Sequence, residues 1–423
     1  MTFKGGVHPP ISKLTAGKPI EKAKEPSKVI IPLQQHIGSP CKPIVKVGDE
    51  VKIGQKIGEC PEKSCSAPVH SSVCGKVLEI KKMPSPNGTH ILSVIIENNQ
   101  KTEKITMKKP SNPEEILNTV KEAGIVGMGG ACFPTHIKLQ PPEDCPIDNL
   151  IINGAECEPY LTCDHRLMLE QPDDILKGIK IVMEILQIPK AFIGVEDNKE
   201  DAIELLKQKN KNKFIEITKL KTKYPQGAEK TLIKTILNKE VPPEKLPMHC
   251  AAVVQNVGTI CAIYNAVING NPLTERIVTV TGDVKEPKNI LVKIGTPFKD
   301  LIDQCGGYTG EPKLIIAGGP MMGIAQYTDD VPVTKGTSGI VVLNKVPEES
   351  SMPCIRCGKC IEVCPVLLMP TLIAKYAEKH RFDMAKEYNV MDCFECGSCE
   401  YACPSKIPLV ELIKYAKQEL CKK

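Results

Sequence analysis

Eight of the 20 cysteines lie close together near the end of the chain and follow a repeated spacing. Both copies read C-x-x-C-x-x-C-x-x-x-C-P, which is the spacing of a bacterial iron–sulfur protein with two clusters. A 4Fe–4S cluster needs four thiolates at tetrahedral corners, and in this arrangement the fourth cysteine of each copy ligates the other cluster. The two predicted ligand sets are Cys354, Cys357, Cys360 and Cys403 for the first cluster, and Cys393, Cys396, Cys399 and Cys364 for the second.

Structural zinc is the alternative for these cysteines. Zinc sites favour two Cys-x-x-Cys pairs separated by a longer loop, whereas this chain has two complete copies of the iron–sulfur spacing. The other cysteines follow no spacing rule and are expected to be small buried residues, although Cys132, Cys157 and Cys163 lie near the loops described next. Two adjacent clusters indicate electron transfer, one electron at a time.

A glycine-rich loop at 127–135 (GMGGACFPT) is a second candidate site. Gly127, Gly129 and Gly130 would let backbone amides approach a phosphate or a flat ring. A Rossmann fingerprint would follow a strand with the spacing G-x-G-x-x-G, but this loop follows an expected helix and is spaced differently. A standard dinucleotide-binding fold is therefore disfavoured, and a purely structural turn stays open.

Polar residues follow several expected strands of the same region. Open α/β sheets bind ligands at the carboxyl ends of their strands, and amides and carboxylates suit the edges of ribose and isoalloxazine rings. Lys138 could pair with a phosphate. The glutamates could instead be solvated loop charges, but their shared position favours a site. The candidates are Asn153, Glu156, Glu158, Gly227, Glu229, Gln255, Asn256 and Thr259.

Length and composition set the frame for these sites. A chain of 423 residues predicts two to four domains, and 41% hydrophobic with 25% charged residues suits a soluble protein with buried cores. The net charge of +5 is too diluted to indicate nucleic-acid binding. No apolar run reaches the roughly 18 residues of a spanning helix, and the start (MTFKGG) lacks a signal-peptide pattern. Abundant cysteines without an export signal favour a reducing compartment and metal over disulfides.

The patterns predict a multidomain α+β protein of four units. Residues 1–108 hold an N-terminal segment and a small-stranded unit resembling a barrel-sandwich hybrid. Residues 109–272 alternate helices and strands, and residues 273–346 return to short strands of β-grasp type. Residues 347–423 form a helical unit with the cysteine repeats, after a linker at 345–353.

Individual elements follow from the same patterns. Helices are expected at 113–123, 199–207, 229–237, 250–269, 297–304 and 409–420. Strands are expected within 28–98, at 149–153, 191–196 and 214–220, and in three short runs after residue 276.

Two of these motifs resemble a known family of proteins. GMGGACFPTHIK resembles the flavin loop of the NADH-oxidising subunit of respiratory complex I, and NGAECEPY resembles its acidic nucleotide loop. The nearer likeness is to the C subunit of Rnf complexes. It covers nearly the whole chain: an FKGGVHPP opening, a barrel-sandwich hybrid, a flavin/nicotinamide domain, a soluble-ligand-binding β-grasp (SLBB) module and twin ferredoxin motifs.

The resemblance implies a noncovalent FMN, with NAD(H) stacked on it. Glu158 and Glu229 would approach the nicotinamide as catalytic residues. Met128, Ala155 and Ala228 depart from the complex I pattern, which leaves individual contacts open. The residues implied at FMN are Gly127, Gly129, Gly130, Lys138, Asn153, Glu156, Gly227, Gln255, Asn256 and Thr259.

The implied function is that of a peripheral subunit on the cytoplasmic side of the cell membrane. It would transfer electrons between ferredoxin and NAD, and its partners would be a ferredoxin-like iron–sulfur subunit and integral membrane subunits that translocate Na⁺ or H⁺. Two alternatives stay open: a soluble reductase of a cobalamin or reductase partner, and a non-catalytic iron–sulfur relay. The N-terminal place of the sandwich unit favours the Rnf interpretation, while Ala155 and Ala228 keep the relay open.

Overall fold

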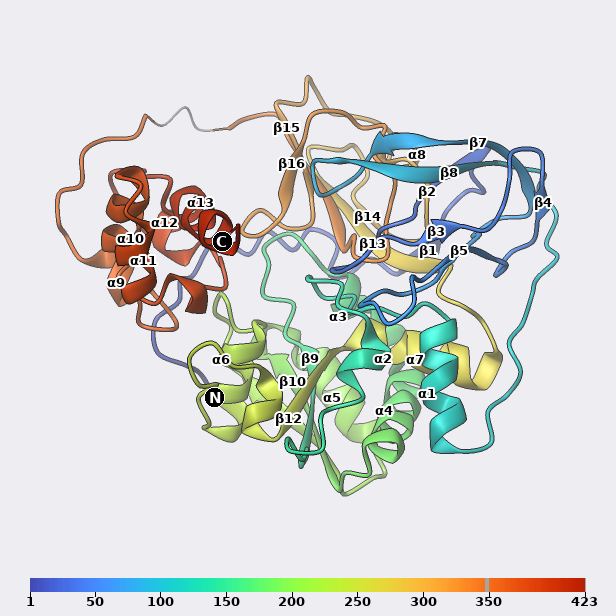
Figure 1. Ribbon diagram of the computed structural model, residues 1–423, viewed down its shortest axis with the longest axis horizontal. Helices are drawn as coiled ribbons and strands as arrows, with labels where there is room; N and C mark the ends of the chain where they lie inside the picture. The colour runs from blue at the N-terminus through green and yellow to red at the C-terminus, as the bar shows by residue number, and fades with distance from the viewer. Residues whose placement is uncertain (347–349, 423) are drawn as a thin grey trace.

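Four β-sheets, the helices that pack on them and a C-terminal lobe of helices make up the part of the chain that the computed structural model describes, residues 1–346 and 350–422 (Figure 1). The C-terminal helices stand beside the rest of the molecule, and the N-terminal strands lie at the opposite side (Figure 1). Some units of the molecule contact segments that are distant from them in the sequence.

The N-terminal unit consists of two small sheets that face each other. Alternating side chains of the strands are buried between them, among them Val29, Ile31, Ile57, Val77 and Val94. Residues 67–71 are all buried and include the strand Val69–His70, so this unit is built as a packed sandwich with no exposed hairpin tip at these residues. Its strands are β2 (Lys28–Pro32), β3 (Lys42–Pro43), β4 (Glu50–Val51), β5 (Lys56–Glu59), β6 (Val69–His70), β7 (Gly75–Pro84) and β8 (His90–Asn98).

The central unit is a parallel four-stranded sheet with helices on both faces. The strand order is β11-β10-β9-β12, and the register places Asn256 of β12 opposite Asn153 of β9 at their carboxyl ends. The strands are β9 (Asn149–Gly154), β10 (Lys190–Glu196), β11 (Ile215–Leu220) and β12 (Ala252–Asn256). The helices are α1 (Pro113–Glu122), α2 (Thr135–Lys138), α3 (Cys163–Glu170), α4 (Pro172–Leu186), α5 (Glu200–Lys209), α6 (Glu229–Leu237) and α7 (Val257–Asn269), with short 3-10 turns at Asp197–Lys199 and Pro247–Cys250.

The expectation of one long helix over 250–269 was wrong. Ala252–Asn256 is the strand β12, all of it buried, and α7 begins only at Val257. The Asn256 side chain accepts a hydrogen bond of 2.8 Å from the Gly258 N–H and so caps the helix. A short apolar run has no periodicity that separates a buried strand from a buried helix, and the adjacent Val253 and Val254 suit a strand.

A six-stranded mixed sheet follows, and it includes a strand from the start of the chain. The order is β1-β14-β13-β17-β15-β16, with β1 paired in parallel to β14. Helix α8 (Phe298–Gln304) packs Phe298, Leu301 and Ile302 into its core. The strands are β1 (Ile20–Lys22), β13 (Glu275–Gly282), β14 (Lys288–Lys293), β15 (Leu314–Ala317), β16 (Ile324–Gln326) and β17 (Gly339–Leu343).

The C-terminal lobe packs short helices around a small apolar core that includes Ile373, Ala377, Ala385, Val390 and Ile413. Part of the expected linker, residues 347–349, lies outside the described residues. Among the described helices, none has the length and apolar character needed to cross a membrane. The helices are α9 (Lys359–Glu362), α10 (Pro370–Glu378), α11 (Phe382–Glu387), α12 (Ser398–Tyr401) and α13 (Leu409–Cys421), with a 3-10 turn at Val390–Asp392.

Candidate functional site

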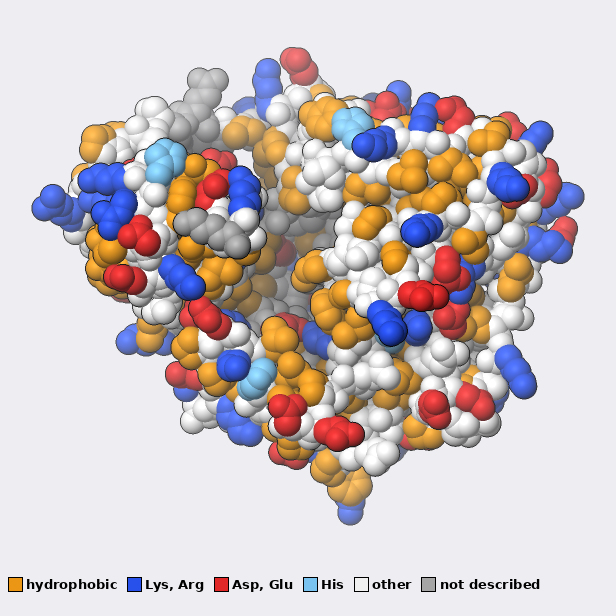
Figure 2. Space-filling model, viewed as in Figure 1, with side chains coloured by type: hydrophobic (Ala, Val, Ile, Leu, Met, Phe, Trp, Pro, Cys, Tyr) orange, Lys and Arg blue, Asp and Glu red, His pale blue; other side chains and the backbone are white. Residues whose placement is uncertain are grey.

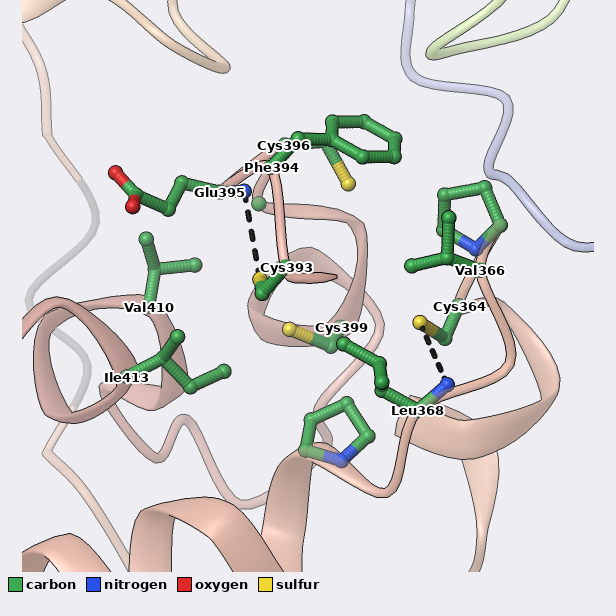
Figure 3. A pocket seen from close by; sticks show the side chains of 13 residues that line it. Cys364, Val366, Leu368, Cys393, Phe394, Glu395, Cys396, Cys399, Val410 and Ile413 are labelled. Carbon is green, nitrogen blue, oxygen red and sulfur yellow. Dashed lines mark hydrogen bonds between the residues drawn. The ribbon is translucent and has the colours of Figure 1, made fainter. Parts of the chain in front are cut away.

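The second predicted set of cysteines surrounds one small, closed space in the C-terminal lobe (Figure 3). Cys364 comes from the turn after α9, and Cys393, Cys396 and Cys399 come from the loop before α12 and from its first turn. Glu395 and Gly397 have positive φ, which curls this loop around the space.

Backbone amides point at two of these sulfur atoms. The Leu368 N–H donates to Cys364 Sγ at 3.3 Å, and the Glu395 N–H donates to Cys393 Sγ at 3.4 Å (Figure 3). Burial raises the pKa of the Cys393 thiol to about 11, so a cation must replace the proton for this sulfur to be a thiolate at neutral pH. Four convergent, largely buried thiols with amide donors fit an iron–sulfur cluster.

The first predicted set surrounds a more open pocket. Its volume is about 370 Å³, against about 20 Å³ for the closed space, and Cys357 is exposed. The pocket combines three cysteines of the first motif with Cys403 of the second, while Cys364 belongs to the closed space. This exchange of the fourth cysteines is the grouping that the spacing predicts.

The glycine loop lies on the carboxyl end of β12 and the first turn of α7. The Met128 N–H donates to Thr259 Oγ1 at 2.9 Å, and Thr259 is fully buried. A Cβ on Gly129 would come within 3.0 Å of the Asn256 side chain, so the loop backbone and that asparagine are in close contact. Gly130 has φ +148°, in the region that favours glycine, and its added Cβ would meet no heavy atom within 4 Å. The loop is thus held at one end and open at Gly130, which fits a cradle for a flat ligand.

Two sets of hydrogen bonds hold the loop after β9, one through Asn153 and Gly227 and the other through Glu156, Asp164 and Asn256. Asn153 Nδ2 donates to the Gly227 carbonyl at 2.7 Å. Glu156 accepts from the backbone N–H of Asp164 at 2.7 Å, at the first turn of α3. Asn256 Nδ2 donates to Asp164 Oδ2 at 2.7 Å, which connects the end of β12 to the same turn of α3.

Asp164 was not a sequence candidate, although it touches two of them. Burial and the nearby negative charge of Glu156 raise the pKa of its carboxyl to about 7. Gln255 is also at this strand end, and its buried Nε2 has no hydrogen-bond partner within the described residues. A buried donor without a partner is rare, so it fits a ligand acceptor such as a flavin carbonyl.

Glu158 reaches away from this group toward the six-stranded sheet. Its carboxylate accepts from the N–H of Met321 at 3.0 Å and of Met322 at 2.8 Å, in the loop between β15 and β16. Burial raises the pKa of Glu158 to about 7 against the lowering effect of these two amides. Lys13 Nζ donates to the backbone carbonyls of Glu156 and Glu158 at 2.9 Å each, which fixes the loop from the N-terminal segment. No spacing rule in the sequence indicates Lys13.

Lys138 and Glu229 form an ion pair with each other at the start of α6. Both side chains are partly exposed. The expected pairing of Lys138 with a phosphate therefore competes with this carboxylate.

Between the C-terminal lobe and the rest of the molecule, the surface is hollowed (Figure 2).

Comparison with known proteins places this geometry in a family. Domain-family models match in chain order as the RnfC barrel sandwich hybrid domain (residues 1–101), the Nuo51 FMN-binding domain (120–265), the SLBB domain (277–325) and the 4Fe-4S dicluster domain (347–404). The chain is 50% identical over 400 residues to the C subunit of the proton-translocating ferredoxin:NAD(+) oxidoreductase complex of Clostridium ljungdahlii, covering 92% of this chain and 87% of the relative. The chain belongs to the RnfC family.

Other relatives in the family are similar over most of their length. Identity is 48% with the C subunit of the Na(+)-translocating ferredoxin:NAD(+) oxidoreductase complex of Acetobacterium woodii, over 92% of this chain and 90% of the relative. It is 41% with the C subunit of the ion-translocating oxidoreductase complex of Rhodobacter capsulatus, over 87% of this chain and 73% of the relative.

RnfC membership confirms several predictions made from the sequence. The fold class and the order of its four kinds of domain are confirmed, and FMN and 4Fe–4S clusters are confirmed as cofactors. The chain is an oxidoreductase subunit of a multisubunit ion-translocating complex. The soluble-reductase alternative is not favoured by these matches, and neither is the relay.

Proposed function

We propose that this chain exchanges electrons between NAD(H) and a ferredoxin through FMN and two 4Fe–4S clusters. It does so as a peripheral subunit on the cytoplasmic side of the membrane. Its partners are a ferredoxin-like iron–sulfur subunit and integral membrane subunits that translocate Na⁺ or H⁺. The domain boundaries at 108, 272 and 346 belong to the same proposal.

One observation carries the proposal: three sets of hydrogen bonds hold the glycine loop, the loop after β9 and the end of β12 in place at the carboxyl edge of one parallel sheet. Bound there, FMN supplies the change from hydride transfer to single-electron transfer. The residues proposed to hold it are Gly127, Gly129, Gly130, Lys138, Asn153, Glu156, Gly227, Gln255, Asn256 and Thr259.

The chain's own residues would orient the ligands. The turn at Gly130 has open space where a Cβ would lie, so a flavin could approach its backbone, and the buried Gln255 amide has an unused donor among the described residues. Glu158 and Glu229 would flank the nicotinamide. Because Glu158 is bonded to the Met321–Met322 backbone, the SLBB domain fixes where that carboxylate lies.

Anaerobic purification tests the assignment directly. We expect about eight irons per chain, from two four-iron clusters, and FMN that is released by acid. NADH should bleach the flavin band. Irons without flavin would support the relay, and about four irons or fewer would refute the twin-cluster assignment.

Replacing Glu158 with Gln tests its proposed place beside the nicotinamide. We expect slower NADH oxidation with unchanged iron and FMN content. Glu311→Gln is the matched control, because Glu311 is a surface residue of the SLBB domain that Glu158 contacts, and 86% of its side chain is exposed. Equal loss of iron in the Glu158 variant would show an effect through folding instead.

A further inference from the structure

The N-terminal segment at residues 3–7 lies between the α/β domain and the C-terminal lobe. The Gly6 N–H donates to the Val363 carbonyl at 2.7 Å, next to Cys364. Val7 and Tyr224 exchange two backbone hydrogen bonds, of 2.8 and 3.0 Å. One short segment thus bonds to both domains at once.

Two glycines make this path possible. Gly5 and Gly6 have φ of +79° and +80°, which side chains disfavour. A Cβ on Gly5 would come within 2.8 Å of the Cys364 carbonyl oxygen, and one on Gly6 within 2.5 Å of the Tyr224 carbonyl oxygen. The segment therefore passes too close to both domains for any other residue.

Tyr224 makes a second connection to the same set of cysteines. Its side chain is 2% exposed, and its hydroxyl donates to the Cys396 carbonyl at 2.6 Å. The ring lies in an apolar cluster with Val7 and Cys396, against which Cys157 and Met321 also pack. The second set of cysteines is therefore attached to the α/β domain directly at Cys396 and, through the N-terminal segment, at Val363 next to Cys364.

The same residues lead back to the candidate flavin site. Tyr224 is three residues before Gly227, whose carbonyl accepts from Asn153 at 2.7 Å. The Gly227 N–H in turn donates to Cys157 Sγ at 3.3 Å, in the loop that also carries Glu156 and Glu158. A cluster ligand and the flavin cradle are thus separated by one hydrogen bond and a short length of chain.

We propose that Gly5, Gly6 and Tyr224 form a clamp that fixes the second cluster site against the flavin-binding domain. This rests on the proposed function. The cluster on Cys364, Cys393, Cys396 and Cys399 then exchanges electrons directly with the flavin, and the cluster in the open pocket is the outer one. When NADH is oxidised, two electrons cross one after the other through this cluster to the outer one and the ferredoxin, and one proton per NADH is released to solvent.

The clamp is tested with Gly5→Ala, Gly6→Ala and Tyr224→Phe in the full chain. Gly17→Ala is the matched control, because it lies in the same N-terminal region and its Cβ would meet no heavy atom within 4 Å. The measurements are iron and FMN content, amide hydrogen exchange of peptides over 390–403, and stopped-flow reduction of the clusters by NADH. Cluster midpoint potentials are followed by electron paramagnetic resonance.

Tyr224→Phe keeps the ring and removes one hydrogen bond, so exchange in this region should rise about fivefold, the factor for one such bond. The potential of the inner cluster alone should shift. The two alanine variants should slow cluster reduction by at least about tenfold at unchanged FMN content, as a clash of this kind displaces the segment. Gly17→Ala should behave as the wild type.

Unchanged exchange and unchanged reduction rates in the variants would overturn the clamp. If the alanine variants lose iron and flavin together, the hydrogen exchange and cluster reduction of Tyr224→Phe decide whether the clamp exists. The cluster order has its own test: Cys399→Ser should leave an outer cluster that dithionite reduces and NADH does not, whereas fast reduction by NADH overturns the order. If the wild type lacks FMN, the proposed function fails, while hydrogen exchange still reports on the clamp.

Discussion

Thr259 offers the sharpest test of how the flavin cradle is held. Its buried hydroxyl accepts the Met128 N–H at 2.9 Å, and this bond fastens the glycine loop to α7. Thr259→Val keeps the shape of the side chain but removes the acceptor. The closed loop would then hold an unsatisfied N–H, which costs about 1–3 kcal/mol.

The loop can avoid that cost by opening until the N–H reaches water. FMN binding must then close it again, so the cost appears in the affinity. At 1.4 kcal/mol per factor of ten, the Kd for FMN should rise between about 5-fold and about 140-fold. Titrating flavin-free protein with FMN, followed by quenching of flavin fluorescence, measures this directly.

Thr259→Ser is the matched control, because it keeps the hydroxyl and loses only a methyl group. It should bind FMN nearly as the wild type does. Thermal unfolding should change little for both variants, since the packing of α7 is kept. If Thr259→Val binds FMN as tightly as Thr259→Ser, the bond does not hold the cradle and the reasoning is wrong.

Three further predictions concern charge and metal. The folded-state pKa of Glu158, about 7, is above its ordinary 4.5, so the folded protein binds this proton more tightly than the unfolded chain does. As pH rises from about 5 to about 7, the free energy of unfolding of the wild type should therefore fall relative to that of Glu158→Gln. A difference that does not change with pH would contradict the burial argument. Lys138→Met should lower the free energy of unfolding in urea by less than about 1 kcal/mol, because the ion pair with Glu229 is partly exposed. The same variant should bind FMN more weakly, and an unchanged Kd for FMN would show that Lys138 is not part of the site. Removing iron with a chelator under mild oxidation should raise hydrogen exchange throughout 354–403, because the C-terminal lobe has only a small apolar core of its own. FMN should stay bound, because the α/β sheet does not depend on the metal. Loss of FMN in step with iron would show that the two units fold as one.

The grouping of the eight cysteines around two pockets was predictable because both motifs follow a known spacing. The spacing alone grouped Cys403 with the first motif and Cys364 with the second, and the pockets have this grouping. Three of the four strands in the parallel sheet were predictable from short apolar runs that alternate with helical segments. The run at 250–256 failed because burial on all sides hides the period that separates strand from helix.

Contacts between distant residues could not be predicted in the same way. Tyr224 is 172 positions from Cys396, and Lys13 is 143 from Glu156. Nothing in the local pattern around either residue indicates a partner, because the contact depends on how whole domains pack. Glu158 was predicted to be near a ligand, but its bonds to Met321 and Met322 depend on the placement of the SLBB loop.

The path of residues 3–22 has a consequence for how the protein is made. These residues bond to Val363, to the loop after β9 and to strand β14, all of which leave the ribosome later. During translation, residues 3–22 therefore lack these bonding partners until the later domains have been synthesised. The N-terminal segment can therefore bond to the C-terminal lobe only after synthesis has passed the first cysteine motif. Factors that deliver iron would meet a nascent chain in which these contacts have not yet formed.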